Sequence, residues 1–250
     1  MRRIKKRTEP ASLSEWRANH QAAPESAGIN FGYSILGQDK AVREELQASL
    51  IAEQGGLCAY TGRRIDSGSC HIEHLIPQSH CALGQGKDVA YDNMVACWPA
   101  PNTSQPVGHG AVPKGDWPAP DEAHLFVSPL NAGCEERFRF NLRGEISASR
   151  DEDRAARETI QHLKLDDRLL TSMRHKEIEA VLGKNRNLGL KDARRRLNRL
   201  AEDEAALAEG NNPELNPFCF ALKQALNTHI NSVENARRQR SQSTRSSSDR

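Results

Sequence analysis

The chain of 250 residues contains no apolar run near the roughly 20 residues that a transmembrane helix needs. Its basic start, MRRIKKR, is followed by TEPASLSEWR instead of the apolar stretch that a secretory signal carries. We therefore expect a cytoplasmic protein without membrane association. In that compartment the six cysteines are expected to be thiols or metal ligands rather than a disulfide framework.

Several motifs that identify common enzyme classes are also missing. The chain has no Walker phosphate-binding loop and no glycine pattern of a dinucleotide-binding fold, which argues against an ATPase and a dinucleotide-dependent enzyme. It shows no internal repeat. Its HIEH sequence lacks the H-E-x-x-H spacing that places two histidines on one helical face, and this disfavours a zinc metallopeptidase.

A basic excess is absent from the body of the chain, although the formal net charge is +2. The first seven residues carry +5 and the last fifteen carry +4, which leaves 2 − 9 = −7 for the rest. A nucleic-acid enzyme usually presents a basic surface. Such a surface would here have to be local, lie in the terminal segments, or come from a partner. The Ser/Arg-rich segment 236–250 is expected to be a disordered, solvated tail.

The hydrophobic content of 37% is typical of a folded chain, and its pattern changes along the sequence. Apolar residues at helical spacing predict a helix over 38–54, which Gly55 and Gly56 should end. The run 57–76 is typical of two short strands around a Gly/Ser turn, closed by Pro77.

The second half of the chain should be mostly helical. The proline-rich segment 99–120 predicts a loop with a short helix near Lys114, and segment 137–149 predicts a hairpin turning at Gly144. Helical periodicity follows from Asp151 onward. The predicted fold is therefore α+β, with a small β-containing centre inside a mostly helical frame.

The sequence HIEH holds the strongest chemical signal. A carboxylate such as Glu73 can hold a hard divalent cation, and an imidazole such as His74 can take a proton from an attacking water. At a strand end before a Pro turn we expect both side chains to face one cleft. Asn93, His109 and Lys114 follow downstream in an order that fits metal-assisted phosphodiester cleavage. An isolated Glu-His pair would otherwise be incidental surface charge.

The stretches that carry this order are GLCAYTGRRI, HIEHLIPQS, YDNMVAC and GHGAVPKGDW. Together they resemble an HNH endonuclease, whose fold is a ββα-metal finger of two strands and a helix around one divalent ion. The opening MRRIKKRTEPASLSEWR and the later FVSPLNAGCEERFRFNLRGEI and TIQHLKLDDRLLTSMR extend the likeness to about residue 174. The extended pattern is similar to the HNH subunit of Septu-type anti-phage systems and of retron-associated relatives.

The resemblance implies roles for individual residues. His74 would be the general base, Glu73 a metal ligand, and Asn93 the residue that braces the finger and orients the base. The last ligand would be His109 or, in competition with it, Asn102. For His109, a solvent-exposed position in a glycine-rich loop is the alternative to metal ligation.

Three cations would contact nucleic-acid phosphates if the resemblance holds. They are Lys114 and the arginine pair Arg63 and Arg64 beside the expected finger. The expected cofactor is Mg²⁺ or Mn²⁺. His71 matches no family role.

The cysteines depart from the family pattern. Relatives commonly carry two cysteine pairs that form a structural zinc knuckle, whereas here Cys58 is paired in spacing with Thr61, and Cys97 with Gly110. Because structural zinc needs four ligands, we do not expect the usual knuckle to form. Cys58 and Cys97 are residual zinc-ligand candidates, or else small buried apolar residues.

The resemblance thus predicts a metal-dependent endonuclease, acting on DNA in preference to RNA as the effector of a bacterial anti-phage system. Its relatives work beside an ABC/SMC-type ATPase, which would be the partner. The alternative is a non-catalytic nucleic-acid-binding or ATPase-regulating subunit with a decayed finger. The expected division is a basic segment and helix (1–56), the HNH core (57–120), a hairpin and helical region (121–235), and the tail (236–250).

Overall fold

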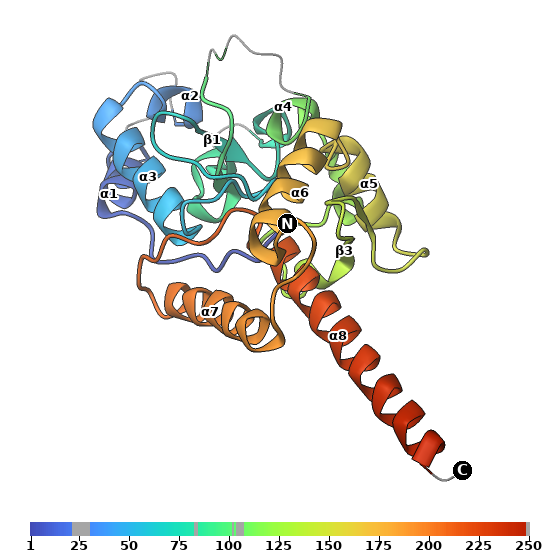
Figure 1. The fold of residues 1–250 in the computed structure, drawn as a ribbon. Helices are drawn as coiled ribbons and strands as arrows, with labels where there is room; N and C mark the ends of the chain where they lie inside the picture. The colour runs from blue at the N-terminus through green and yellow to red at the C-terminus, as the bar shows by residue number, and fades with distance from the viewer. Residues whose placement is uncertain (22–30, 83–84, 102, 104–107, 249–250) are drawn as a thin grey trace.

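The computed structural model describes residues 1–21, 31–82, 85–101, 103 and 108–248. It is an α+β fold with two separate two-stranded antiparallel sheets, surrounded by helices (Figure 1). No helix in these described ranges combines the length and the apolarity of a membrane span.

The described residues of the N-terminal part include helices α1 (Ala11–Gln21), α2 (Tyr33–Leu36) and α3 (Lys40–Glu53). Helix α3 confirms the predicted helix. The Asp39 side chain accepts a hydrogen bond from the backbone of Val42 and so caps its start. After the helix, Gly55 has a positive φ of 65°, a conformation that suits glycine and ends the helix.

Strand β1 (His71–His74) pairs antiparallel with β2 (Met94–Cys97). The prediction of two strands within 57–76 was half right, because only a single bridge, between Leu57 and Arg64, forms before β1. The physical reason lies in burial, since all four residues of β2 are fully buried. The apolar residues of β2 lie in the core, and β1 forms its strand pairing with them. The polar Gly/Ser turn before β1 cannot be buried in this way and forms no second strand.

The next elements are the short helix α4 (Ala111–Lys114) and the hairpin of β3 (Phe138–Phe140) and β4 (Ile146–Ala148). Both were predicted. At the hairpin turn, Gly144 has a φ of 77° and lies so close to helix α6 (Arg168–Leu182) that a Cβ would meet the Thr171 carbonyl at 2.5 Å. Short 3₁₀ turns cover Gln78–His80, Lys87–Val89, Tyr91–Asn93, Pro120–Leu125 and Glu135–Arg137.

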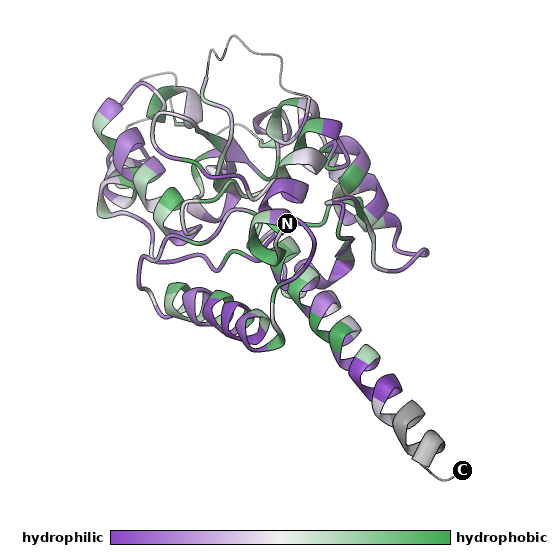
Figure 2. Ribbon diagram, in the orientation of Figure 1, coloured by the Kyte–Doolittle hydropathy of each residue, from purple (hydrophilic) through white to green (hydrophobic). Residues whose placement is uncertain are grey.

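Four helices follow: α5 (Arg154–His162), α6 (Arg168–Leu182), α7 (Leu190–Ala208) and α8 (Cys219–Ser248). Helices α6 and α7 pack on α8, whose outer part extends away from the rest of the chain (Figure 1). Hydrophilic residues predominate on the visible face of α7 (Figure 2). Whereas the sequence predicted a disordered tail from residue 236, α8 continues to Ser248; the good helix propensity of Ala, Arg and Gln accounts for 236–240 but not for the Ser-rich end.

The start of α8 is attached to the turn before β1. The backbone of Phe218 donates to the Gly62 carbonyl at 2.9 Å, and the backbone of Leu215 donates to the Gly55 carbonyl at 3.0 Å. A Cβ at Gly62 would lie 2.5 Å from the ring of Phe220, so the two segments are in close contact. The C-terminal helices are thereby held against the segment that leads into β1.

Candidate functional site

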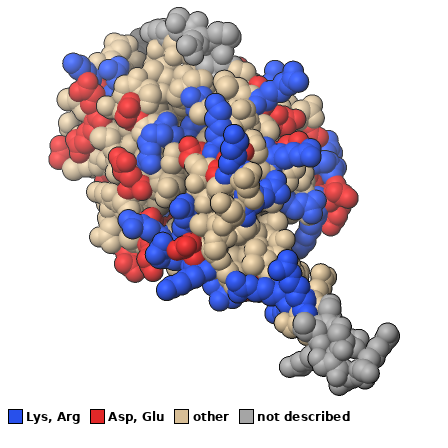
Figure 3. Space-filling model, viewed as in Figure 1, with Lys and Arg blue, Asp and Glu red and all other residues tan. Residues whose placement is uncertain are grey.

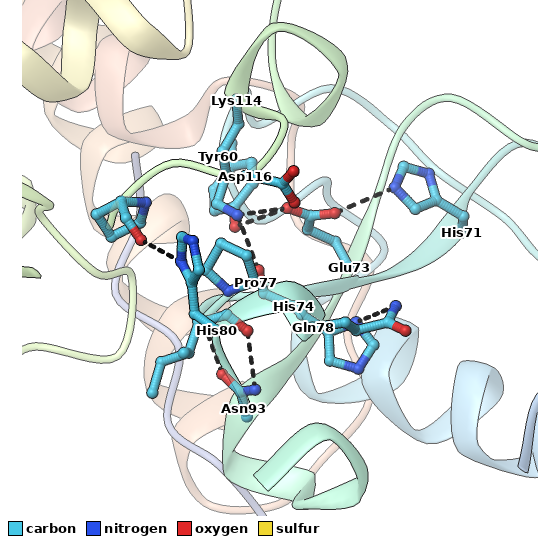
Figure 4. A network of polar contacts seen from close by, with 12 residues as sticks. Tyr60, His71, Glu73, His74, Pro77, Gln78, His80, Asn93, Lys114 and Asp116 are labelled. Carbon is cyan, nitrogen blue, oxygen red and sulfur yellow. Dashed lines mark hydrogen bonds and ion pairs between the residues drawn. The ribbon is translucent and has the colours of Figure 1, made fainter. Parts of the chain in front are cut away.

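Strand β1 directs its side chains alternately to two faces, as every strand does. His71 and Glu73 are half-buried on one face, whereas Ile72 and His74 are buried on the other. Figure 4 shows Glu73 and His74 on opposite sides of the strand. The structure therefore differs from the expectation that both side chains face one cleft, because neighbouring residues of a regular strand cannot share a face.

The Glu73 carboxylate contacts three side chains. Its Oε1 lies 3.0 Å from the Lys114 ammonium and accepts a hydrogen bond of 3.4 Å from the Tyr60 hydroxyl, and its Oε2 lies 3.5 Å from His71 Nε2. Burial alone would raise the pKa of Glu73, but the hydrogen bond from His71 and the charge of Lys114 lower it. Glu73 is thus an ionised carboxylate whose two oxygens already face partners.

Lys114 is buried, with a side chain only 1% exposed. Its ammonium donates to the His74 carbonyl at 2.9 Å as well as contacting Glu73. Helix α4 places it there, because Lys114 is the last residue of this short helix. The sequence predicted a phosphate contact for Lys114, but the structure places its ammonium inside the protein, against a carboxylate.

His71 is a member of this group that sequence reasoning did not assign. Its Nδ1 donates to the Pro99 carbonyl at 2.5 Å, and it borders a groove of about 910 Å³ whose walls also include Tyr33, Gln47 and Val112. Burial alone would lower the pKa of His71, but the hydrogen bonds to Glu73 and Pro99 raise it. The signal in the sequence was the two-residue spacing from Glu73, which places both side chains on one face of a strand.

On the opposite face, the hydrogen bonds of His74 define its protonation. Its Nε2 donates to the Asp88 carbonyl at 2.8 Å, and its Nδ1 accepts from the Gln78 amide at 3.2 Å. Since a carbonyl can only accept, the proton is on Nε2 and the lone pair is on Nδ1. Burial lowers the pKa of His74 below 6.5, so the ring is neutral near pH 7. The Tyr33 ring packs edge-on against the imidazole, with centroids 4.5 Å apart.

Asn93 braces the segment that follows β1. Its Oδ1 accepts from the backbone of Ile76 at 2.7 Å, and its Nδ2 donates to the carbonyls of Ile76 at 3.1 Å and Lys87 at 3.0 Å. These bonds tie the turn after His74 to the segment that carries Asp88. The contacts are of the kind that a bracing role would use, whereas among the described residues no hydrogen bond joins Asn93 to the side chain of His74, which it was also expected to orient.

His109 belongs to a different cluster. It is buried, its Nδ1 donates to Asp167 at 3.2 Å, and its Nε2 lies 3.3 Å from the Arg63 guanidinium. The ring stacks on Trp98 with centroids 5.4 Å apart, and Arg63 lies over the same indole at 3.7 Å. Within the described part of the chain no hydrogen bond or ion pair joins His109 to Glu73, and both its ring nitrogens face other partners. Sequence reasoning missed Trp98 and Asp167, which are distant in sequence.

The two arginines that were expected to contact phosphates also have partners inside the protein. Arg63 is engaged with Trp98, as described. Arg64 donates to the carbonyls of Gly55 and Gly56 at 3.3 and 3.4 Å and to that of Leu215. In this conformation Arg64 therefore links the turn before β1 to the segment that precedes α8.

The four positions of the expected cysteine pairs converge, although two of them carry no sulfur. Buried Cys58 is hydrogen-bonded to Cys97 and to Thr61, and a Cβ at Gly110 would lie 3.1 Å from the Thr61 methyl group. Burial alone would raise the pKa of Cys58, but these hydrogen bonds lower it to about 6. The pKa of Cys97 is raised by its burial. A tetrahedral zinc site needs four ligands, and this cluster supplies two thiols.

The described residues do not complete a divalent-cation site. Among them, no group of three or more His, Cys, Asp or Glu side chains is placed to hold a metal ion. Mg²⁺ is usually held by one or two carboxylates together with water and substrate oxygens. Glu73 supplies one carboxylate, but the Lys114 ammonium already occupies the position beside it. The competing ligand candidate Asn102 lies outside the described residues.

A second surface feature lies away from β1. A groove of about 870 Å³ between α7 and α8 has five cationic side chains in its walls: Lys191, Arg194, Arg195, Arg199 and Arg237. Figure 3 shows Lys and Arg side chains gathered over this part of the molecule. Arg194 pairs with Glu234 and Arg195 with Asp192. Ion pairs are absent for the other three groove cations in the part of the chain that the structure describes.

No protein-family model matches this chain, and no curated protein matches it at a significant level. Any functional conclusion therefore depends on the geometry above and on the sequence motifs.

Proposed function

We propose that this chain hydrolyses phosphodiester bonds of nucleic acid, DNA in preference to RNA, as an HNH-type endonuclease. The observation that carries the proposal is the state of His74, a neutral imidazole with its proton fixed on Nε2 and a basic Nδ1. The ordered motifs around His74 and Asn93, which resemble the HNH family, supply the substrate class.

The proposed chemistry begins at Nδ1 of His74. Gln78, whose amide contacts this nitrogen, is exposed, so solvent reaches the base once the amide moves aside. A water at Nδ1 would transfer a proton to the ring while its oxygen forms a bond to phosphorus and the bond to the leaving oxygen breaks. The Asp88 carbonyl holds the imidazole in place and stabilises its protonated form.

The groove between α7 and α8 supports nucleic acid as the ligand. Guanidinium groups form paired hydrogen bonds with phosphate oxygens, and three of the cations in the groove have no ion pair within the described ranges. Outside its terminal segments the chain is acidic, and this groove is a local basic surface, one of the three sources of positive charge that the charge distribution left open.

The experiment is a plasmid and RNA cleavage assay with and without Mg²⁺ or Mn²⁺. It compares the wild type with His74→Ala and with His124→Ala, a matched control at an exposed histidine. Cleavage that His74→Ala abolishes, with unchanged circular dichroism, while His124→Ala cleaves like the wild type, supports the proposal. Full activity of His74→Ala would refute it.

The proposed biological setting is bacterial anti-phage defence beside an ABC/SMC-type ATPase. It rests on the resemblance to Septu-type HNH subunits and on the absence of a phosphate-binding loop in this chain. The exposed segment 235–241 of α8 offers a docking element. Co-purification of the chain with such an ATPase in a defined complex tests this proposal, and full nuclease efficiency of the chain alone would count against it.

A second function is a nucleic-acid-binding or ATPase-regulating subunit without cleavage activity. Two observations favour it. Lys114 pairs with the carboxylate that a metal would need, and Thr61 and Gly110 stand where relatives carry cysteines. In this case the protein would bind nucleic acid or the ATPase but cut nothing under any metal condition, and His74→Ala would leave its biological effect intact.

A further inference from the structure

The buried ion pair between Lys114 and Glu73 resembles a metal-binding site in which the lysine ammonium takes the place of the metal ion. The ammonium contacts two oxygens, Glu73 Oε1 at 3.0 Å and the His74 carbonyl at 2.9 Å. These are the oxygen types, a carboxylate and a backbone carbonyl, that also bind hard divalent cations. Both lie at β1, and the lysine reaches them from α4.

A divalent cation could not share this position with the ammonium. Oε1 of Glu73 already accepts from Lys114 and from Tyr60, and the side chains of Glu73 and Lys114 are only 16% and 1% exposed. Like charges a few ångströms apart in a poorly solvated place repel strongly. The other carboxylate oxygen faces His71 Nε2 at 3.5 Å.

We propose that Lys114 is the resident cation of Glu73 and competes with divalent metal ions for it. Mn²⁺ or Mg²⁺ binds at Glu73 only when the ammonium is withdrawn, so removal of the lysine charge opens a metal site that the wild-type chain keeps closed. Val112 of α4, which is 53% exposed, borders the groove beside His71, so a ligand in this groove lies against the helix that carries Lys114. The inference concerns ion binding and does not depend on the proposed nuclease function.

The test is a Mn²⁺ titration followed by the electron paramagnetic resonance signal of the free ion, without nucleic acid. Lys114→Met is expected to bind one Mn²⁺ at least tenfold more tightly than the wild type. Lys114→Met combined with Glu73→Gln should return to the wild-type level. The matched control Lys87→Met, which removes an exposed lysine charge, should leave binding unchanged.

Equal Mn²⁺ affinity of the wild type and folded Lys114→Met would overturn the proposal. If Lys114→Met does not fold, the proposal is tested by comparing the Mn²⁺ binding of the wild type with that of Glu73→Gln. A tight Mn²⁺ site in the wild type that Glu73→Gln removes contradicts the proposal, whereas indistinguishable Mn²⁺ binding by these two proteins supports it.

Discussion

Removing the three groove cations that have no ion pair among the described residues should weaken nucleic-acid binding and make it less dependent on salt. The perturbation is Lys191→Ala, Arg199→Ala and Arg237→Ala together, side chains that are exposed and line the groove. Each phosphate contact contributes about 0.9 to the slope of log affinity against log salt for duplex DNA, so three contacts contribute about 2.7. Between about 50 and 200 mM salt this contribution corresponds to an affinity change of about 40-fold.

The assay is fluorescence anisotropy with a labelled duplex at several salt concentrations. The control variant carries Arg143→Ala, Arg150→Ala and Arg157→Ala, three exposed arginines outside the groove, and has the same net charge as the groove variant. We expect the slope of the groove variant to fall by about 2.7 relative to wild type, and that of the control by much less. An unchanged slope in the groove variant, or an equal fall in both, would refute the assignment of the groove to phosphate binding.

Three further outcomes follow from single features. Because burial lowers the pKa of His74 below its usual 6.5 and the base acts when neutral, the acid limb of the cleavage rate should be centred below pH 6.5; an acid limb centred above 6.5 contradicts this. Thr61→Cys with Gly110→Cys should give one bound zinc per chain by metal analysis, because the four positions converge; since Gly110 has a φ of 82°, the variant is first checked for wild-type circular dichroism, and a wild-type zinc content in the folded variant would contradict the convergence. Arg174→Met leaves two buried carbonyls without a donor, at about 1–3 kcal/mol each, so urea unfolding should show a loss of about 2–6 kcal/mol; a loss under about 1 kcal/mol would contradict this reasoning.

Local elements of this fold could be predicted because their signals lie within a few residues. The helix over 40–53 carries its apolar face, its Asp39 cap and its glycine end in one continuous segment. The hairpin at Gly144 likewise has two short strands around one turn. The pairing of β1 with β2 had no such local signal, because its register depends on the burial of a run about 20 residues further along.

In the candidate site, too, contacts between residues far apart in the sequence could not be predicted. The role of Asn93 stays a prediction; its hydrogen bonds to Ile76 and Lys87 span 17 and 6 positions. Lys114 could not be placed from the sequence, because lysine is seldom buried and its partner Glu73 lies 41 positions away. His109 was expected beside Glu73, but its contacts with Trp98 and Asp167 depend on how α6 packs against the loop before α4.

The attachment of α8 gives this helix a mechanical property. Its 30 residues correspond to a rod about 45 Å long, and its root is hydrogen-bonded through Phe218 to Gly62, the residue before Arg63. A protein that binds the outer end of α8 would act on this helix far from its attachment at the Gly62 turn. A force on α8 would act through the Phe218–Gly62 hydrogen bond on the backbone next to Arg63, whose guanidinium contacts Trp98 and His109.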